Sequence, residues 1–142
     1  MEKRAKVNFY ILTSFNNQTH RGSYDLLLEY YIANRDLDYR KPFHVSDVRG
    51  NSSVHLILFG IIDGLKKMKK RELEITICTN TPFGIMDIYQ KDGKLRSKAI
   101  GKANREEKEV IRQLLHKSNH TMNYLHCEYV KQKVKAEETL YR

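Results

Sequence analysis

The sequence contains no tryptophan, two prolines and two cysteines among its 142 residues. The spacing of Cys78 and Cys127 matches no zinc motif, so we expect buried thiols rather than a metal site or a disulfide. No apolar run approaches the roughly 20 residues that cross a bilayer. No apolar segment of signal-peptide form follows the first residues. These absences favour a cytoplasmic protein without a membrane span.

Acidic side chains are also scarce. Seventeen Asp and Glu residues stand against 26 Lys and Arg residues, which gives a net charge of +9 and a pI near 9.5. Such an excess of positive charge favours a polyanionic partner, for which nucleic acid is the first candidate and an acidic protein surface the second. An anionic membrane is disfavoured because no strongly amphipathic basic helix begins the chain.

The pattern of apolar residues predicts one domain over residues 1–142, because no linker or repeat divides the chain. Alternation of apolar and polar residues predicts five strands, at 6–15, 23–32, 39–48, 73–79 and 122–131. Helical spacing predicts helices at 51–70 and 105–117, the latter capped by Asn104, together with a short helix at 83–89 and a stub of helix at the end. Because a helix separates the third and fourth strands, these strands permit a parallel crossover, whereas the first three suit antiparallel pairing.

Three short stretches resemble the catalytic segments of the ribonuclease H family. They are Leu12-Thr13-Ser14-Phe15 at the end of the first strand, Asn51-Ser52-Ser53-Val54-His55-Leu56 at the start of the first helix, and Thr79-Asn80-Thr81 at the end of the fourth strand. That family has an Asp after Thr on the first strand, a Glu in the first turn of the helix, and an Asp after Thr on the fourth strand. The matching positions here hold Ser14, His55 and Asn80.

The resemblance, which covers nearly the whole chain, implies an α/β fold of ribonuclease H type: a mixed five-stranded sheet with helices packed on it. It also implies a degenerate metal site, because two-metal phosphodiester cleavage needs several carboxylates and Mg²⁺ prefers hard oxygen ligands. Ser14 and Asn80 offer neutral oxygens, and His55 offers nitrogen, which suits Zn²⁺ or Mn²⁺ better. A last acid at Glu137 or Glu138 does not replace four. We expect no catalytic residues, no metal and no cofactor.

The family's way of holding substrate implies where a nucleic acid touches this chain. The loop after the first strand and the start of the first helix supply polar groups that position phosphates, and a basic loop takes the place of the family's basic protrusion. Further lysines stand near the far wall of the site. The expected binding residues are Asn16, Asn17, Gln18, Arg21, Asn51, Ser52, Ser53, Lys91, Lys94, Arg96, Lys98, Lys102, Lys131, Lys133 and Lys135.

Three functions are compatible with these features. The first is a catalytically inactive module that binds RNA or an RNA–DNA hybrid. The second is a mobile-element or phage protein that binds and inhibits a host nucleoprotein or nuclease machine. The third is an active Mn²⁺-dependent nuclease that uses His55 and a C-terminal Glu. A hydrolytic set of Ser14 and His55, with Asp25 or Asp47 orienting the imidazole, is a remote fourth reading. The three replaced positions, Ser14, His55 and Asn80, are equally compatible with drift at a site no longer used.

Overall fold

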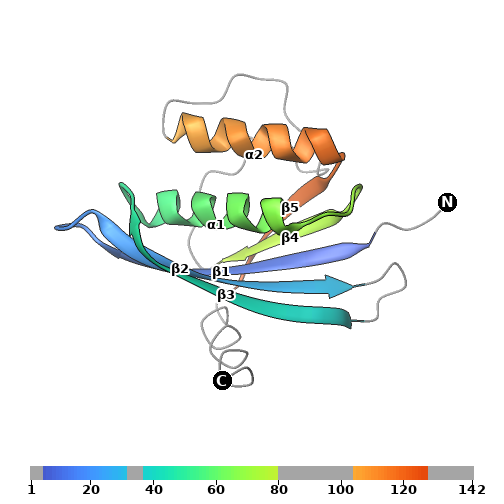
Figure 1. The fold of residues 1–142 in the computed structure, drawn as a ribbon, viewed down its shortest axis with the longest axis horizontal. Helices are drawn as coiled ribbons and strands as arrows, with labels where there is room; N and C mark the ends of the chain where they lie inside the picture. Colours follow the sequence, from blue (N-terminus) through green and yellow to red (C-terminus); the bar gives the residue numbers. More distant parts are fainter. Residues whose placement is uncertain (1–4, 32–36, 80–103, 128–142) are drawn as a thin grey trace.

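A computed structural model describes residues 5–31, 37–79 and 104–127, which form five strands and two helices (Figure 1). In chain order these are β1 (Lys6–Asn16), β2 (Arg21–Tyr31), β3 (Leu37–Arg49), α1 (Ser53–Lys67), β4 (Glu74–Thr79), α2 (Arg105–Ser118) and β5 (Thr121–His126). The strands make one sheet in the order β3-β2-β1-β4-β5. The first three strands pair antiparallel, and β1, β4 and β5 pair parallel. The predicted mixed five-stranded sheet is therefore confirmed.

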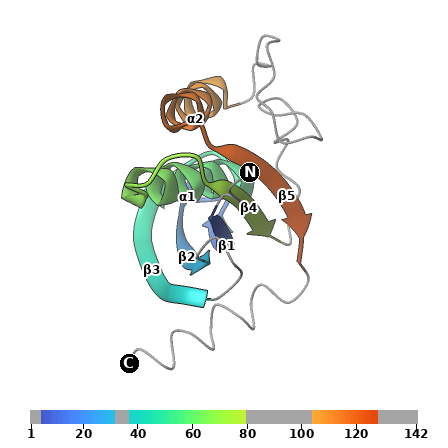
Figure 2. The same cartoon turned by 90° about the vertical axis from the view of Figure 1, so that its right-hand side faces the viewer.

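One face of the sheet carries the core, because the strands alternate in the way that the sequence predicts. Val7, Phe9 and Ile11 of β1 are fully buried on this face, opposite Tyr30, Leu28 and Leu26 of β2 in the register. Helix α1 covers this face, and α2 lies beside α1 on the side away from the sheet (Figure 2). No helix among the described residues is long and apolar enough to span a membrane.

The other face of the sheet is more polar and holds a buried carboxylate. Glu29 is 0% exposed and accepts hydrogen bonds from Arg40 Nε (2.8 Å), Tyr31 Oη (3.2 Å) and Asn8 Nδ2 (3.4 Å). A buried carboxylate is costly unless it is paired and hydrogen-bonded, and these donors meet that condition. On the same face, Leu27 packs against Tyr10, Leu12 and Cys127.

Several predicted boundaries are wrong by a few residues. The predicted 51–70 helix is shorter, because Ser52 caps it and Met68 is extended (φ −82°, ψ 121°) after its last turn. Strand β5 ends at His126, and Cys127, which was expected inside the strand, follows it. The predicted short helix at 83–89 and the terminal helix lie outside the described residues. Cys78 and Cys127 are both free thiols; Cys78 is buried as expected, whereas Cys127 is only partly buried.

The predicted cap of α2 is also wrong in its chemistry. Asn104 stands at the N-cap position, but its backbone is left-handed (φ 53°, ψ 36°) and its side chain makes no capping hydrogen bond. Its Oδ1 atom instead accepts a hydrogen bond from Asn51 Nδ2 at 3.0 Å. A side chain that was expected to serve its own helix therefore links that helix to the start of α1.

Two glycines of α1 lie where the helix meets β1, and they provide a matched test of that contact. A Cβ at Gly64 would lie 2.6 Å from Cε2 of the fully buried Phe9, whereas one at Gly60 would lie 3.2 Å from Ile11 Cγ2. Both Gly→Ala changes gain helix propensity, worth about 1 kcal/mol. We expect Gly64→Ala to lower the free energy of unfolding by about 1–3 kcal/mol through overpacking. Gly60→Ala should change the free energy of unfolding much less, as measured by urea titration. Equal free energies of unfolding for the two variants would contradict this packing.

The raised pKa of Tyr24 predicts that the protein loses stability at alkaline pH. Burial, and then the negative charge of Asp63, which accepts a hydrogen bond from its hydroxyl at 3.0 Å, raise the pKa of Tyr24 well above the ordinary value. The unfolded chain ionises its tyrosines near pH 10, so stability is fully present below that pH and falls as the pH rises above it. Urea titrations from pH 8 to pH 11 should show a shallower fall for Tyr24→Phe than for the wild type. An unchanged slope would contradict the assignment.

Candidate nucleic-acid interface

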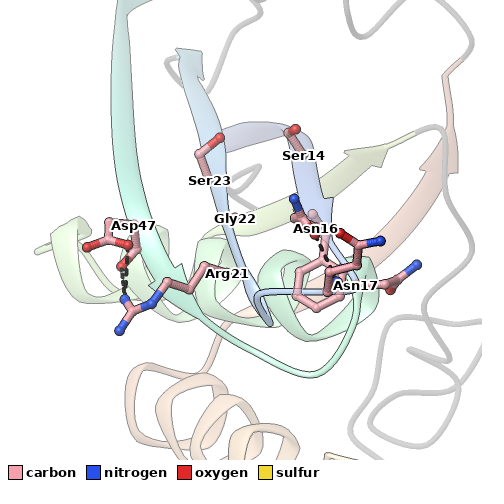
Figure 3. Close-up of a pocket in the computed structure, with 9 residues that line it drawn as sticks. Ser14, Asn16, Asn17, Arg21, Gly22, Ser23 and Asp47 are labelled. Atoms are coloured by element: carbon pink, nitrogen blue, oxygen red, sulfur yellow. Dashed lines mark hydrogen bonds and ion pairs between the residues drawn. The ribbon is translucent and has the colours of Figure 1, made fainter.

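A shallow, polar hollow of about 790 Å³ lies at the end of the β1–β2 hairpin (Figure 3). Strand β1 contributes Ser14, and β2 contributes Ser23, its partner in the register. The rest of the lining comes from the turn, the strand ends and β3: Phe15, Asn16, Asn17, Gln18, Arg21, Gly22 and Asp47. The hollow therefore gathers hydroxyl, amide and guanidinium groups on one open surface.

The turn that shapes this hollow is held by Asn16. Its Oδ1 atom accepts hydrogen bonds from the backbone N–H groups of Gln18 (2.8 Å) and Thr19 (3.3 Å), a local pattern that Asn commonly forms in turns. His20 closes the turn with a left-handed backbone (φ 56°), and its N–H donates to Asn16 O at 3.0 Å. His20 O then accepts from Gly50 N at 2.9 Å. The turn is thereby tied to the segment that leads into α1.

The charged pair in the hollow is exposed. Arg21 Nη1 lies 2.9 Å from Asp47 Oδ1, and the two side chains are 49% and 76% exposed. Exposed pairs of this kind contribute about 0–1 kcal/mol, because water and salt screen them. Asp47 is the single acidic residue in the lining. Arg21 can therefore exchange this partner for a phosphate at small cost.

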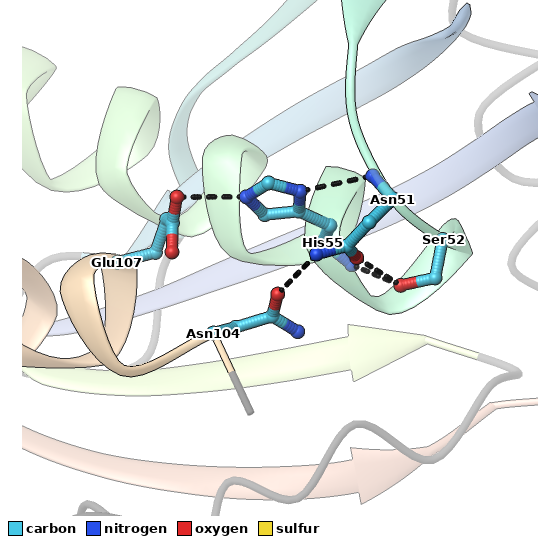
Figure 4. Close-up of polar contacts among 5 residues, drawn as sticks. All are labelled: Asn51, Ser52, His55, Asn104 and Glu107. Carbon is cyan, nitrogen blue, oxygen red and sulfur yellow. Dashed lines mark hydrogen bonds and ion pairs between the residues drawn. The ribbon is translucent and has the colours of Figure 1, made fainter. Parts of the chain in front are cut away.

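His55, the residue at the family's Glu position, belongs to a second polar network at the start of α1 (Figure 4). Its Nδ1 atom accepts the backbone N–H of Asn51 at 3.1 Å, which leaves the ring hydrogen on Nε2. Nε2 donates to Glu107 Oε1 at 2.7 Å, and the imidazole centroid lies 4.5 Å from that of Phe59. Both ring nitrogens are thus engaged by protein groups.

Asn51 and Ser52 spend their polar atoms within the same network. Ser52 Oγ donates to Asn51 Oδ1 at 2.9 Å and accepts from His55 N at 3.2 Å, which satisfies an N–H of the first turn of α1. Asn51 Nδ2 donates to Asn104 Oδ1. Glu107 lies in the first turn of α2, where an acidic side chain complements the helix dipole. The network therefore fastens the start of α2 to the start of α1.

The structure brings together part of the predicted site. Ser14, Asn16, Asn17, Gln18 and Arg21 share the hollow, whereas Asn51, Ser52 and His55 form the network at the start of α1. Ser53 is the first residue of α1 and does not line the hollow. The other predicted positions lie outside the described residues: Asn80, Lys91, Lys94, Arg96, Lys98, Lys102, Lys131, Lys133 and Lys135, as well as Glu137 and Glu138.

Three contacts of the site were not predicted. Asp25 and Asp47 do not orient His55, because Asp25 pairs with His44 (2.6 Å) and Asp47 with Arg21. The carboxylate that meets His55 is Glu107, 52 residues away in the chain. The sequence signal for this contact was the position of Glu107 in the first turn of a predicted helix. An acidic residue there indicates a stabilised helix and does not identify a partner.

The described part of the chain contains no group of three or more His, Cys, Asp or Glu side chains placed to hold a metal ion. His55 offers no lone pair, because Nδ1 accepts from Asn51 and Nε2 carries a hydrogen. Ser14 supplies a neutral oxygen, whereas Mg²⁺ is usually bound through carboxylates. This chemistry can hold a phosphate by hydrogen bonds and charge, but it does not assemble a divalent cation site among these residues.

Solved structures with a similar arrangement include ribonucleases H. LC9-RNase H1, a type 1 enzyme with the type 2 active-site motif, aligns with a TM-score of 0.59 and 13% identity over 90% of this chain and 65% of its own. RNase H1 from Halobacterium salinarum aligns with a TM-score of 0.52 and 11% identity over 92% of this chain and 89% of its own. The chain has the ribonuclease H-like fold.

A third ribonuclease H-like structure is that of LC11-RNase H1 in complex with an RNA/DNA hybrid. It aligns with a TM-score of 0.50 and 10% identity over 90% of this chain and 88% of its own. The chain spans 65% of the length of LC9-RNase H1. No protein-family model matches the chain, and no curated protein sequence matches it either.

The His55–Glu107 contact predicts a strong coupling between α1 and α2. The two side chains are 14% and 17% exposed, so their charge-assisted hydrogen bond should contribute about 1.5–3 kcal/mol to a double-mutant cycle of His55→Ala and Glu107→Ala. The exposed Arg21–Asp47 pair is the matched control, with an expected coupling of at most about 1 kcal/mol. Urea unfolding measures both cycles. Equal couplings would show that the His55 contact is not the link described.

Proposed function

We propose that this protein is a catalytically inactive ribonuclease H-like module that binds double-stranded nucleic acid, an RNA–DNA hybrid or an RNA duplex, without cutting it. The main support for this proposal is that both ring nitrogens of His55 are hydrogen-bonded within the protein. At the position where the resembled family has a metal-binding Glu, both nitrogens of His55 are used by Asn51 and Glu107. A side chain in that role holds two helices together and has nothing left with which to coordinate a cation.

The hollow next to this network supports the binding half of the proposal. Its hydroxyl and amide groups and its guanidinium are suited to phosphate oxygens, and half or more of the hydrogen bonds between proteins and DNA go to phosphates and sugars. The net charge of +9 supplies the sequence-independent attraction. LC11-RNase H1, which is similar in fold, was solved with an RNA/DNA hybrid. A cytoplasmic location belongs to the same proposal.

The proposal differs from an active Mn²⁺-dependent nuclease in one decisive respect. Such an enzyme needs His55 to give up its contact with Asn51 or Glu107 and to present a nitrogen to the metal. A partly buried hydrogen bond to a carboxylate opposes that change, because breaking it leaves Glu107 without this partner.

The other alternative is a mobile-element or phage protein that inhibits a host nucleoprotein machine. It requires a protein partner, and it becomes the leading hypothesis if no nucleic acid binds.

Binding and cutting are tested on the same substrates. We expect the purified protein to bind a 5′-labelled RNA–DNA hybrid of about 20 base pairs at low salt, with a log–log salt slope that reports about 0.9 per phosphate contact. We expect no cleavage with Mg²⁺ or Mn²⁺ in gel assays. A protein that binds neither hybrid nor duplex RNA overturns the proposal, and metal-dependent cutting overturns its catalytic half.

The contribution of the hollow is isolated by the double variant Arg21→Gln/Asp47→Asn, which leaves the net charge unchanged. Loss of one phosphate contact should lower the salt slope by about 0.9. The control is Lys6→Gln, which removes an exposed cation that strand alternation places on the face of the sheet away from α1. A slope that is unchanged in the double variant, or reduced equally in the control, would mean that the hollow is not the contact.

A further inference from the structure

A run of cations at the end of α1 is not explained by the site already described. Lys66, Lys67, Lys69, Lys70 and Arg71 place five positive charges within six residues. Cations stabilise the negative end of a helix dipole, but that effect falls off within the last turn. Only Lys66 and Lys67 lie in that turn, and the other three follow the extended Met68. The helix therefore accounts for two of the five.

Several of these cations are positioned by aromatic side chains. Lys70 Nζ donates to Tyr30 Oη (2.7 Å) and lies 4.6 Å from the centroid of that ring. The Phe43 ring has Lys67 Nζ at 4.6 Å and Lys41 Nζ at 5.5 Å from its centroid. Such cation–π contacts orient an ammonium group and leave its charge intact. We call Lys41, Lys66, Lys67, Lys69, Lys70 and Arg71 the far-end cluster.

Among the described residues, two acidic side chains near the far-end cluster already have partners. Asp63 forms an ion pair with Lys67, and the nearby Glu72 accepts a hydrogen bond from Asn119. Arg71 donates to the carbonyl of Lys117 (2.8 Å), which brings a further cation alongside. Lys66 and Lys69 are exposed, and within the described ranges neither makes a hydrogen bond or an ion pair. Like charges crowded in this way repel one another, and a polyanion relieves that repulsion.

The β1–β2 turn, whose residues line the hollow, lies near the start of α1 (Figure 1), whereas most of the far-end cluster lies at or just after the end of this helix. The helix has 15 residues, so its ends are about 22 Å apart at 1.5 Å per residue. B-form DNA rises about 3.4 Å per base pair along one strand, so roughly seven base pairs cover that distance, and the more compact A-form duplexes of RNA need slightly more. A duplex of about 20 base pairs is long enough to meet both surfaces, whereas one of five base pairs is not.

We propose that the far-end cluster is a second, sequence-independent phosphate-binding surface, and that one duplex contacts it together with the hollow. This inference rests on the proposed function and extends it from one contact surface to two. The expected ligand is the phosphate backbone of a duplex that runs the length of α1. Lysines suit this task because they bind phosphate as mobile point charges without geometric demands.

Lys66→Gln/Lys69→Gln tests the inference, because these two exposed lysines make no hydrogen bond or ion pair within the described ranges. For a 20-base-pair hybrid we expect the salt slope to fall by about 1.8, two contacts at about 0.9 each. For a hairpin with a five-base-pair stem we expect no change. Lys66→Arg/Lys69→Arg keeps the charge and should bind like the wild type. A further comparison sets Lys69→Gln against Lys6→Gln, which removes the same charge from the other face of the sheet.

The outcomes separate this inference from the function on which it rests. If the wild type binds neither length, the proposed function fails, and the inference fails with it. If the wild type binds but Lys66→Gln/Lys69→Gln has the wild-type slope on 20 base pairs, or loses equally on both lengths, only the inference is overturned. Polyglutamate serves as a carboxylate probe. If Lys66→Gln/Lys69→Gln loses polyglutamate binding but keeps hybrid binding, the surface is assigned to an acidic protein. That result would also overturn the inference.

Discussion

The close approach of α1 to the sheet is the constraint on which the other features depend. Gly64 and Gly60 allow the helix to lie directly on Phe9 and Ile11 of β1, and Gly22 on β2 leaves room for Leu56 from the first turns of α1. These contacts fix the height and direction of the helix at both ends. They set the start of α1 beside the β1–β2 turn, where the hollow and the His55 network adjoin, and its basic end at the opposite edge.

Most of the fold could be predicted because its signals are local. Alternation along β1 and β2 separates a core face from a polar face, and the burial of Tyr24, Leu26, Leu28 and Tyr30 follows it. The ends of elements were less predictable, since the helix stopped at Lys67 although Met68 and the lysines after it suit a helix in isolation.

The site was less predictable than the fold because its key contacts join distant segments. His55 meets Glu107 only after α2 has docked on α1, and no pattern within either helix encodes that meeting. Asn104 is a second case in which the local sequence did not identify the partner of a side chain. It is a favoured capping residue, yet its side chain contacts Asn51 instead, because tertiary contact competes with the local hydrogen bond. The sequence could place the residues at helix ends but not choose their partners.

His55 stands where the family resemblance leads one to expect Glu, and the two side chains would give this corner opposite electrostatics. A carboxylate at that position would face Glu107 at close range, and two such groups remain ionised together only when a cation lies between them. An imidazole with its hydrogen on Nε2 turns the same geometry into an attraction and makes it a link between helices. With His55 in place, this corner of the described structure is held together by an attraction between α1 and α2.

Under the proposed function, the positively charged Arg and Lys side chains attract the phosphate backbone in place of metal ions. They do so in a different way. Two metals a few ångströms apart concentrate charge on a single phosphate and stabilise both the attacking and the leaving oxygen. Arg21 in the hollow and the lysines beyond α1 spread single charges over a distance comparable with the helix itself. Spread charge lowers the free energy of binding along the backbone, yet it favours no one phosphate over its neighbours. Binding and cleavage therefore become separate properties of one fold, because the first needs summed charge and the second needs charge at a point.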